Sequence, residues 1–226
     1  LASSAFSMKS NKEDLAKKII QAQSLNDNPE VLLVGVHFFL GDYTPAVTQW
    51  AEEKKKHLTA SEKYLMGLIY NKGCGKIERN PQQAFVNFAK NMMMISEKDE
   101  STMVRYHMRN LIKEASTSED YDFVAKTAYL TWFMNSFDDS QIFSLFERVV
   151  KSEAASTLKA MAFYYMSDIL SYEDFEGHDE EKALEFLQEA AKLGHKDAKQ
   201  KLEDKNRKSI LIENDPTNHQ DPENPF

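Results

Sequence analysis

The sequence predicts an all-α fold in which helix pairs stack into a right-handed α/α superhelix, or solenoid, of about eleven helices. Apolar residues recur at helical spacing along most of the 226-residue chain, and no run of period-two alternation is comparably clear. A pattern at 66–75 leads into a second apolar segment at 83–88, and a weaker copy at 166–170 leads into 182–187. Because one helix pair cannot bury its own apolar face, repetition of the pair predicts a core formed by stacking.

Three prolines mark helix starts, in the pairs Asn28-Pro29, Thr44-Pro45 and Asn80-Pro81. The preceding Asn or Thr is a good N-cap, and proline is tolerated at the first helical position because its missing N–H has no helical partner to lose. Thr59 and Glu62 have capping-box spacing and predict a further start. The expected helices are 11–24, 29–40, 45–56, 60–72, 81–95, 101–115, 119–135, 139–151, 153–171, 179–193 and 195–205.

These helices suggest one helical-repeat domain over residues 11–205, preceded by a flexible segment at 1–10. The small residues from Leu1 to Ser7 resemble the end of an export signal, although a boundary within a longer protein is an alternative. Residues 206–226 form a polar, proline-containing tail. Its apolar segment Ile210–Ile212 is expected to dock as a cap on the last repeat.

The composition limits the classes of partner. A formal net charge of -8 argues against general binding to nucleic-acid phosphates and favours a partner with a neutral or basic contact surface. The alternative is that this charge serves solubility alone. No stretch approaches the roughly 18 apolar residues of a membrane-spanning helix, so no transmembrane segment is expected in the chain.

The residues that could carry chemistry do not form a recognisable motif. Cys74 is the only cysteine, which excludes a disulfide within the chain, and its position between Gly73 and Gly75 predicts a tight turn. The six histidines lack the spacing of a zinc site on one helix face. The acidic segment 178–181 is explained by the preference for carboxylates in the first turn of a helix. The sequence therefore predicts no catalytic, cofactor-binding or metal site.

Several residues resemble the Sel-like repeat family, a subgroup of tetratricopeptide-like helix pairs. In the first copy the matching residues are Met66, Gly67, Tyr70, Gly73, Gly75, Ala84 and Phe88. In the second they are Lys182, Ala183, Phe186, Leu187, Glu189, Ala190, Ala191, Gly194 and Ala198, whereas Ser167 and Leu170 replace the family's glycine and tyrosine. The second helices align with Ala46, Ala84, Ile142 and Ala183 in register, followed four residues later by Trp50, Phe88, Phe146 and Leu187. An alternative register uses Ala128 and Trp132.

The resemblance implies a non-enzymatic scaffold for protein–protein interaction in a bacterial envelope, located in the periplasm. Members of the family serve as adaptors in envelope assembly and signalling, and small exported members resemble immunity proteins that neutralise secreted antibacterial toxins such as lipase effectors. The alternative location is the cytoplasm, where the same kind of protein would act as a regulator or chaperone adaptor. A small helical hydrolase is the alternative from another class, and it would need titratable groups that converge in one pocket.

The resemblance also suggests where a partner binds, because the first helix of each pair lines the concave side in this family. The positions that the packing motif leaves free on those helices are Phe39, Tyr64, Leu68, Asn71, Tyr164 and Asp168. Tyr64 and Tyr164 are the expected anchors, since buried aromatic side chains carry much of the energy of an interface.

Overall fold

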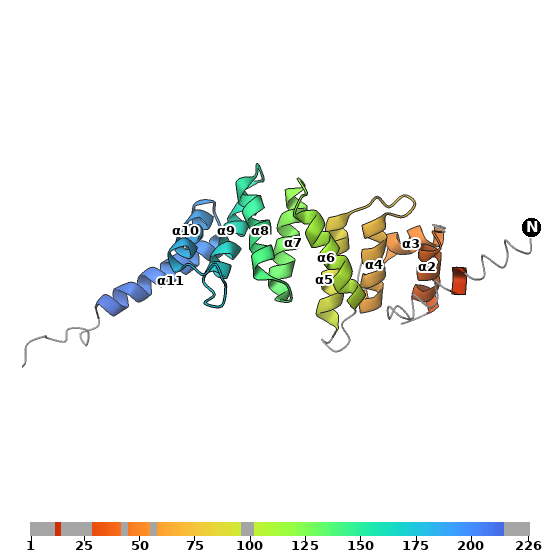
Figure 1. Cartoon of the computed structure of the whole chain (residues 1–226), viewed down its shortest axis with the longest axis horizontal. Coiled ribbons are helices and arrows are strands. Elements are labelled where there is room, and N and C mark those ends of the chain that lie inside the picture. The colour runs from red at the N-terminus through yellow and green to blue at the C-terminus, as the bar shows by residue number, and fades with distance from the viewer. Residues whose placement is uncertain (1–11, 15–28, 42–44, 55–57, 96–101, 215–226) are drawn as a thin grey trace, which may run out of the picture. The chain divides into compact units, whose positions relative to one another are not determined.

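The computed structural model describes residues 12–14, 29–41, 45–54, 58–95 and 102–214, and its regular structure is helical throughout these ranges apart from one short bridge between Cys74 and Ile77 (Figure 1). The helices with defined bounds are α2 (Pro29–Phe39), α3 (Pro45–Glu53), α4 (Ala60–Lys72), α5 (Pro81–Met94), α6 (Thr102–Ala115), α7 (Tyr121–Met134), α8 (Asp139–Lys151), α9 (Ser156–Leu170), α10 (Glu180–Lys192) and α11 (Lys196–Glu213). The predicted all-α class is confirmed. Within the described ranges, no helix has the length and apolar character that a membrane span requires.

The predicted helix starts at 29, 45, 60 and 81 are confirmed, and at 60 and 81 the capping residues act as expected. Thr59 forms a capping box with Glu62, and the side chain of Asn80 accepts a hydrogen bond from the Gln83 N–H. The predicted end of the last helix at 205 is wrong, since α11 continues to Glu213. The segment 1–10, most of the predicted helix 11–24 and the tail beyond 214 lie outside the described residues.

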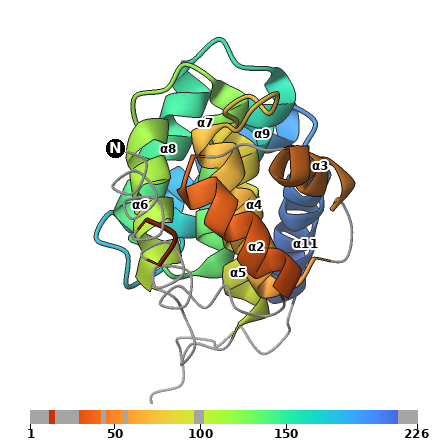
Figure 2. The ribbon, with the colours of Figure 1, turned by 90° about the vertical axis from the view of Figure 1, so that its right-hand side faces the viewer.

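The chain divides into two compact units, residues 1–137 and 138–226. In the first unit, α4 and α5 form a helical hairpin, and α2 lies against α4 (Figure 2). The helices α6 and α7 pack on α5. In the second unit, α9 is the central helix, with α8 and α10 packed against it, and α11 follows on α10. Each unit has its own buried apolar core. The single repeat domain over 11–205 stays a prediction.

The α4–α5 hairpin depends on a glycine. Gly67 on α4 lies against the ring of Phe88 on α5, and a Cβ at Gly67 would come within 2.5 Å of a ring carbon. Phe88 and Ala84 are fully buried, as the sequence pattern predicted. A residue without a side chain therefore allows the two helices to approach until an aromatic ring fills the space between them.

The α9–α10 hairpin closes in a related way with different residues. Ser167 takes the position that Gly67 has in the first hairpin, and its buried hydroxyl donates a hydrogen bond of 2.6 Å to the carbonyl oxygen of Ala183 on α10. Leu187, which corresponds to Phe88, is also buried. A smaller apolar residue on α10 leaves room for the serine side chain, which makes a polar contact across the hairpin.

The two hairpins also share the geometry of their second helix start. The Asn80 N–H donates to the carbonyl oxygen of Tyr70 at 2.8 Å, and the Asp179 N–H donates to that of Leu170 at 3.0 Å. Asp179 caps α10 through the Lys182 N–H, as Asn80 caps α5. The repeated pattern of the sequence thus corresponds to a repeated local structure.

The second half of α11 does not pack on the rest of its unit. Residues 203–214 are all exposed, and this part of the helix runs clear of α9 and α10 (Figure 1). The side chains of Ile210, Leu211 and Ile212 are 56%, 70% and 63% exposed. The expectation that this segment docks as a cap is therefore wrong, because the helix carries it away from the last repeat.

Candidate functional site

In the second unit, α9 and α11 bring four polar or aromatic side chains together on the surface. Tyr164 and Asp168 lie one turn apart on α9, while His195 caps α11 and Lys201 lies in its second turn. The imidazole of His195 stacks on the Tyr164 ring with centroids 4.3 Å apart and planes inclined by 17°. The Lys201 ammonium lies 5.1 Å from the centroid of the same ring and bonds the Asp168 carboxylate at 2.5 Å. We call these four residues the α9–α11 cluster.

The turn between α10 and α11 positions His195. Gly194 has a φ of 96°, in the left-handed region that favours glycine, so the chain can reverse direction directly after α10. The His195 N–H donates to the Ala190 carbonyl oxygen at 3.0 Å, which ties the turn to the end of α10. The His195 Nδ1 accepts a hydrogen bond from the Ala198 N–H at 3.2 Å and so caps α11.

Burial and nearby charges shift the pKa values of His195 and Lys201 in opposite directions. Burial lowers the pKa of the His195 imidazole, and the nearby carboxylates of Asp197 and Asp168 only partly oppose this effect. Burial is the largest single effect on Lys201 and would lower its pKa, but the hydrogen bond that Lys201 donates to Asp168, together with the charges of Asp168, Tyr164 and Tyr172, raises the pKa overall. Burial raises the pKa of the Tyr164 hydroxyl. At neutral pH the cluster therefore presents a neutral imidazole, a neutral phenol and a paired ammonium and carboxylate.

The cluster combines an aromatic ring with a paired ammonium and carboxylate. Tyrosine is enriched at protein interfaces, whereas lysine and aspartate are depleted there. Among the described residues, no group of three or more His, Cys, Asp or Glu side chains is arranged to hold a metal ion. Cys74 is buried, and burial raises the pKa of its thiol, which disfavours the nucleophilic thiolate.

The six residues predicted to bind a partner are divided between the two units. Tyr164 and Asp168 meet in the α9–α11 cluster, whereas the other four belong to the first unit. Phe39, at the end of α2, is half-buried against Phe38, with ring centroids 5.4 Å apart. A role in binding for Phe39, Asn71, Tyr164 and Asp168 stays a prediction.

Tyr64 and Leu68 are not accessible anchors, in contrast to the expectation from the sequence. Tyr64 is only 1% exposed, and Leu68 is buried as well. The reason is the position of α4, which is covered by α2 and by α5. The Tyr64 ring lies 5.9 Å from the ring of Phe88 and 6.2 Å from that of His107 on α6. Both residues pack the core of the first unit.

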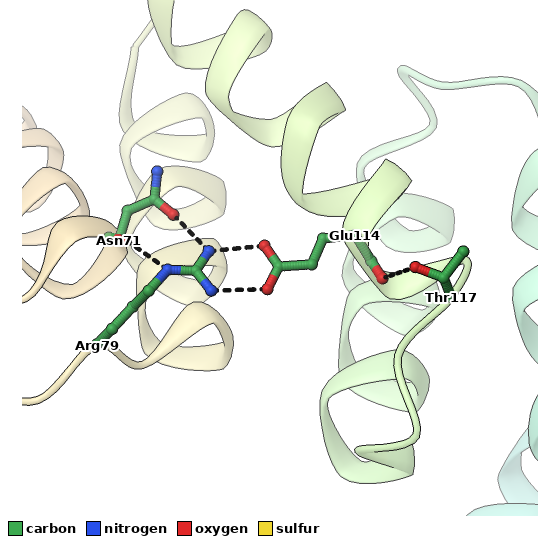
Figure 3. A network of polar contacts seen from close by, with 4 residues as sticks. All are labelled: Asn71, Arg79, Glu114 and Thr117. Carbon is green, nitrogen blue, oxygen red and sulfur yellow. Dashed lines mark hydrogen bonds and ion pairs between the residues drawn. The ribbon is translucent and has the colours of Figure 1, made fainter.

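Asn71 takes part in a polar network that ties the α4–α5 turn to the end of α6 (Figure 3). Arg79 donates to the backbone and side-chain oxygens of Asn71 and holds Glu114 through two bonds of 2.6 and 2.7 Å. The Glu114 carbonyl oxygen accepts from the Thr117 hydroxyl at 3.3 Å. The hydrogen bond from Arg79 lowers the pKa of Glu114, so the pair is charged at neutral pH. Asn71 therefore has a structural partner within its own unit.

Sequence reasoning missed His195 and Lys201 as members of the cluster. The available signal was local, because a histidine directly after Gly194 stands where an N-cap is expected. The pairing of Lys201 with Asp168 joins residues 33 apart in sequence, and no spacing rule for one helix predicts it.

Comparisons of the chain with protein-family models, with curated proteins and with solved structures find no match.

Proposed function

We propose that this protein is a non-enzymatic scaffold that binds another protein, and that its helix pairs stack as a right-handed, Sel-like or tetratricopeptide-like superhelix. The exposure of Ile210, Leu211 and Ile212 on α11 carries the proposal. Three consecutive large apolar side chains in water are costly for a soluble surface and are typical of a site that another molecule covers. The shared closure of the α4–α5 and α9–α10 hairpins supports the repeat architecture.

The second unit supplies a surface of uneven charge for such a partner. The loop between α9 and α10 exposes Glu173, Asp174 and Glu176, whereas the turns of α11 before the apolar residues carry Lys205, Arg207 and Lys208. We propose that the partner is neutral or basic where it meets the loop, in line with the net charge of -8. Acidic groups of the partner would suit the basic turns of α11.

The proposal also includes a location, the periplasm, and one of two biological roles. An immunity protein that neutralises a secreted toxin such as a lipase effector forms a stable stoichiometric complex, whereas an adaptor in envelope assembly or signalling exchanges its partners. These two roles therefore differ in the lifetime of the complex that the protein forms. The alternative is that the protein is located in the cytoplasm and acts there as a regulator.

Site-specific photocrosslinking in the organism of origin tests the proposal. A crosslinking amino acid at Leu211 should capture one predominant protein, and the same group at Glu185, an exposed residue of α10, serves as the matched control. Leu211→Glu should weaken binding of the captured protein, once purified, by at least tenfold, because a charge would enter an apolar contact. Equal crosslinking from both positions, or unchanged affinity of Leu211→Glu, would contradict the proposal.

A further inference from the structure

The attachment of α11 depends on few contacts, all near its beginning. Of the α11 residues, which the structure describes in full, Ala198 is buried and Leu202 is partly buried against the core formed with Leu187 and Ala190. The Lys201–Asp168 ion pair and the His195 cap add to this attachment. Residues 203–214 are all exposed. Loss of a contact in the first two turns should therefore weaken the attachment of the whole helix.

The His195 cap works in one protonation state only. Its Nδ1 accepts the hydrogen bond from the Ala198 N–H, and an acceptor nitrogen must carry no proton. Protonation would place an N–H opposite another N–H and add a positive charge at the end of the helix where the macrodipole disfavours cations. The cap would then be lost, and the stacked Tyr164 ring would face an imidazolium.

Several groups surround the imidazole. On α9 it faces the Tyr164 ring and the Asp168 carboxylate, and on its own helix it faces Asp197. Lys201 shares the Tyr164 ring, and α10 contributes the backbone carbonyl of Ala190. The two carboxylates favour the charged imidazole, whereas burial and the capping hydrogen bond favour the neutral one.

We propose that His195 is a pH-sensitive latch that loosens α11 from the α9–α10 hairpin when the imidazole is protonated. Burial lowers the pKa of His195 in the folded state, which agrees in sign with this latch. A group with a lowered histidine pKa stabilises the fold fully above about pH 6.5, and this contribution is lost as the pH falls through that value towards the folded pKa. The latch concerns the chain by itself; only its effect on binding through Ile210–Ile212 rests on the proposed function.

Amide hydrogen exchange of the whole chain tests the latch. Between pH 7.5 and 5.5, the protection factors of the Ala198–Leu202 amides should fall about fivefold relative to those of α10, the ratio expected when one N-cap is lost. His195→Asn keeps a capping side chain that does not titrate, so its ratio should stay constant. His195→Ala should be poorly protected at both pH values. His178→Asn, at an exposed histidine outside α11, is the matched control and should keep the wild-type response.

Equal pH responses of the wild type and His195→Asn would overturn the latch. A second measurement covers the case in which a variant does not fold. In wild-type protein labelled with ¹⁵N, the His195 ring should carry its proton on Nε2 and not on Nδ1 at pH 7.5. A proton on Nδ1 at that pH would exclude the capping hydrogen bond and with it the latch.

Discussion

Gly67 on α4 and Phe88 on α5 are in such close contact that a methyl group on Gly67 would lie 2.5 Å from Cε1 of the Phe88 ring. Both residues are buried in the first unit. The contact sets how closely the two helices of this hairpin approach, and it explains why the sequence pattern combines a glycine with an aromatic residue 21 positions later.

Gly67→Ala should destabilise the protein, because the added methyl group overpacks a site that is closed by an aromatic ring, and such overpacking costs about 1–3 kcal/mol. The gain in helix propensity, about 1 kcal/mol from glycine to alanine, acts in the opposite direction and is smaller than the expected clash. Urea unfolding followed by circular dichroism measures the difference. Phe88→Leu shortens the facing side chain, so the double variant Gly67→Ala, Phe88→Leu should lose less stability from the added methyl group than the Gly67→Ala variant does.

Ser167→Ala is the matched control at the corresponding position of the second hairpin. It removes the hydroxyl that donates to Ala183 but keeps the Cβ, so we expect a loss of about 1 kcal/mol or less. A Gly67→Ala variant as stable as the wild type would show that α4 and α5 are not in the contact described.

Tyr64→Phe should be as stable as the wild type or more stable by up to about 1 kcal/mol. The Tyr64 hydroxyl is buried without a hydrogen-bond partner among the described residues, so removing it ends a desolvation cost. Tyr64→Ala should cost about 3–5 kcal/mol, since it leaves a large cavity beside Phe88 and His107. Thermal unfolding of both variants checks these two expectations. A marked loss of stability in Tyr64→Phe would contradict the burial of an unpaired hydroxyl.

The positions of the helices were predictable from the sequence, but the accessibility of individual residues was not. Proline after Asn80 and the Thr59–Glu62 pair act within one turn of the chain, so local rules identify them. Tyr64 was expected on a free face, yet its burial depends on α2 and α6, which approach from distant parts of the sequence. The cluster around Tyr164 was missed for the same reason, because Lys201 reaches it from another helix.

The Arg79–Glu114 pair should contribute about 0.5–1 kcal/mol of coupling energy in a double-mutant cycle with Arg79→Gln and Glu114→Gln. The two-bond geometry is favourable, but both side chains are more than one third exposed, so solvent screens the pair. The coupling should decrease between 0.05 and about 0.5 M salt.

The same pair predicts a pH dependence. The Arg79 guanidinium lowers the pKa of Glu114 in the folded state, so the stabilising contribution is complete above the ordinary glutamate value of about 4.3 and is lost as the pH falls below it. Arg79→Gln should raise the pKa of Glu114, which NMR titration of its side-chain carbon can follow. An unchanged pKa would mean that the two side chains do not pair in solution.

Asn135→Gly should leave stability unchanged or raise it by a few tenths of a kcal/mol, whereas Asn135→Ala should lower it by about 1 kcal/mol. Asn135 ends α7 with a φ of 51°, in the left-handed region that glycine adopts freely and alanine does not. Thermal unfolding of the three proteins measures the order. If alanine is tolerated as well as glycine, the left-handed end of α7 is not present in solution.

The central claim is that the α4–α5 and α9–α10 hairpins close by one repeated plan of helix contact. Nuclear Overhauser spectroscopy of the isotopically labelled chain tests it most directly. We expect cross-peaks between the Gly67 Hα protons and the Phe88 ring protons, and between the Ser167 and Ala183 side chains and backbones, all of which join residues on different helices. Assigned resonances for these four residues without cross-peaks between either pair would contradict the account.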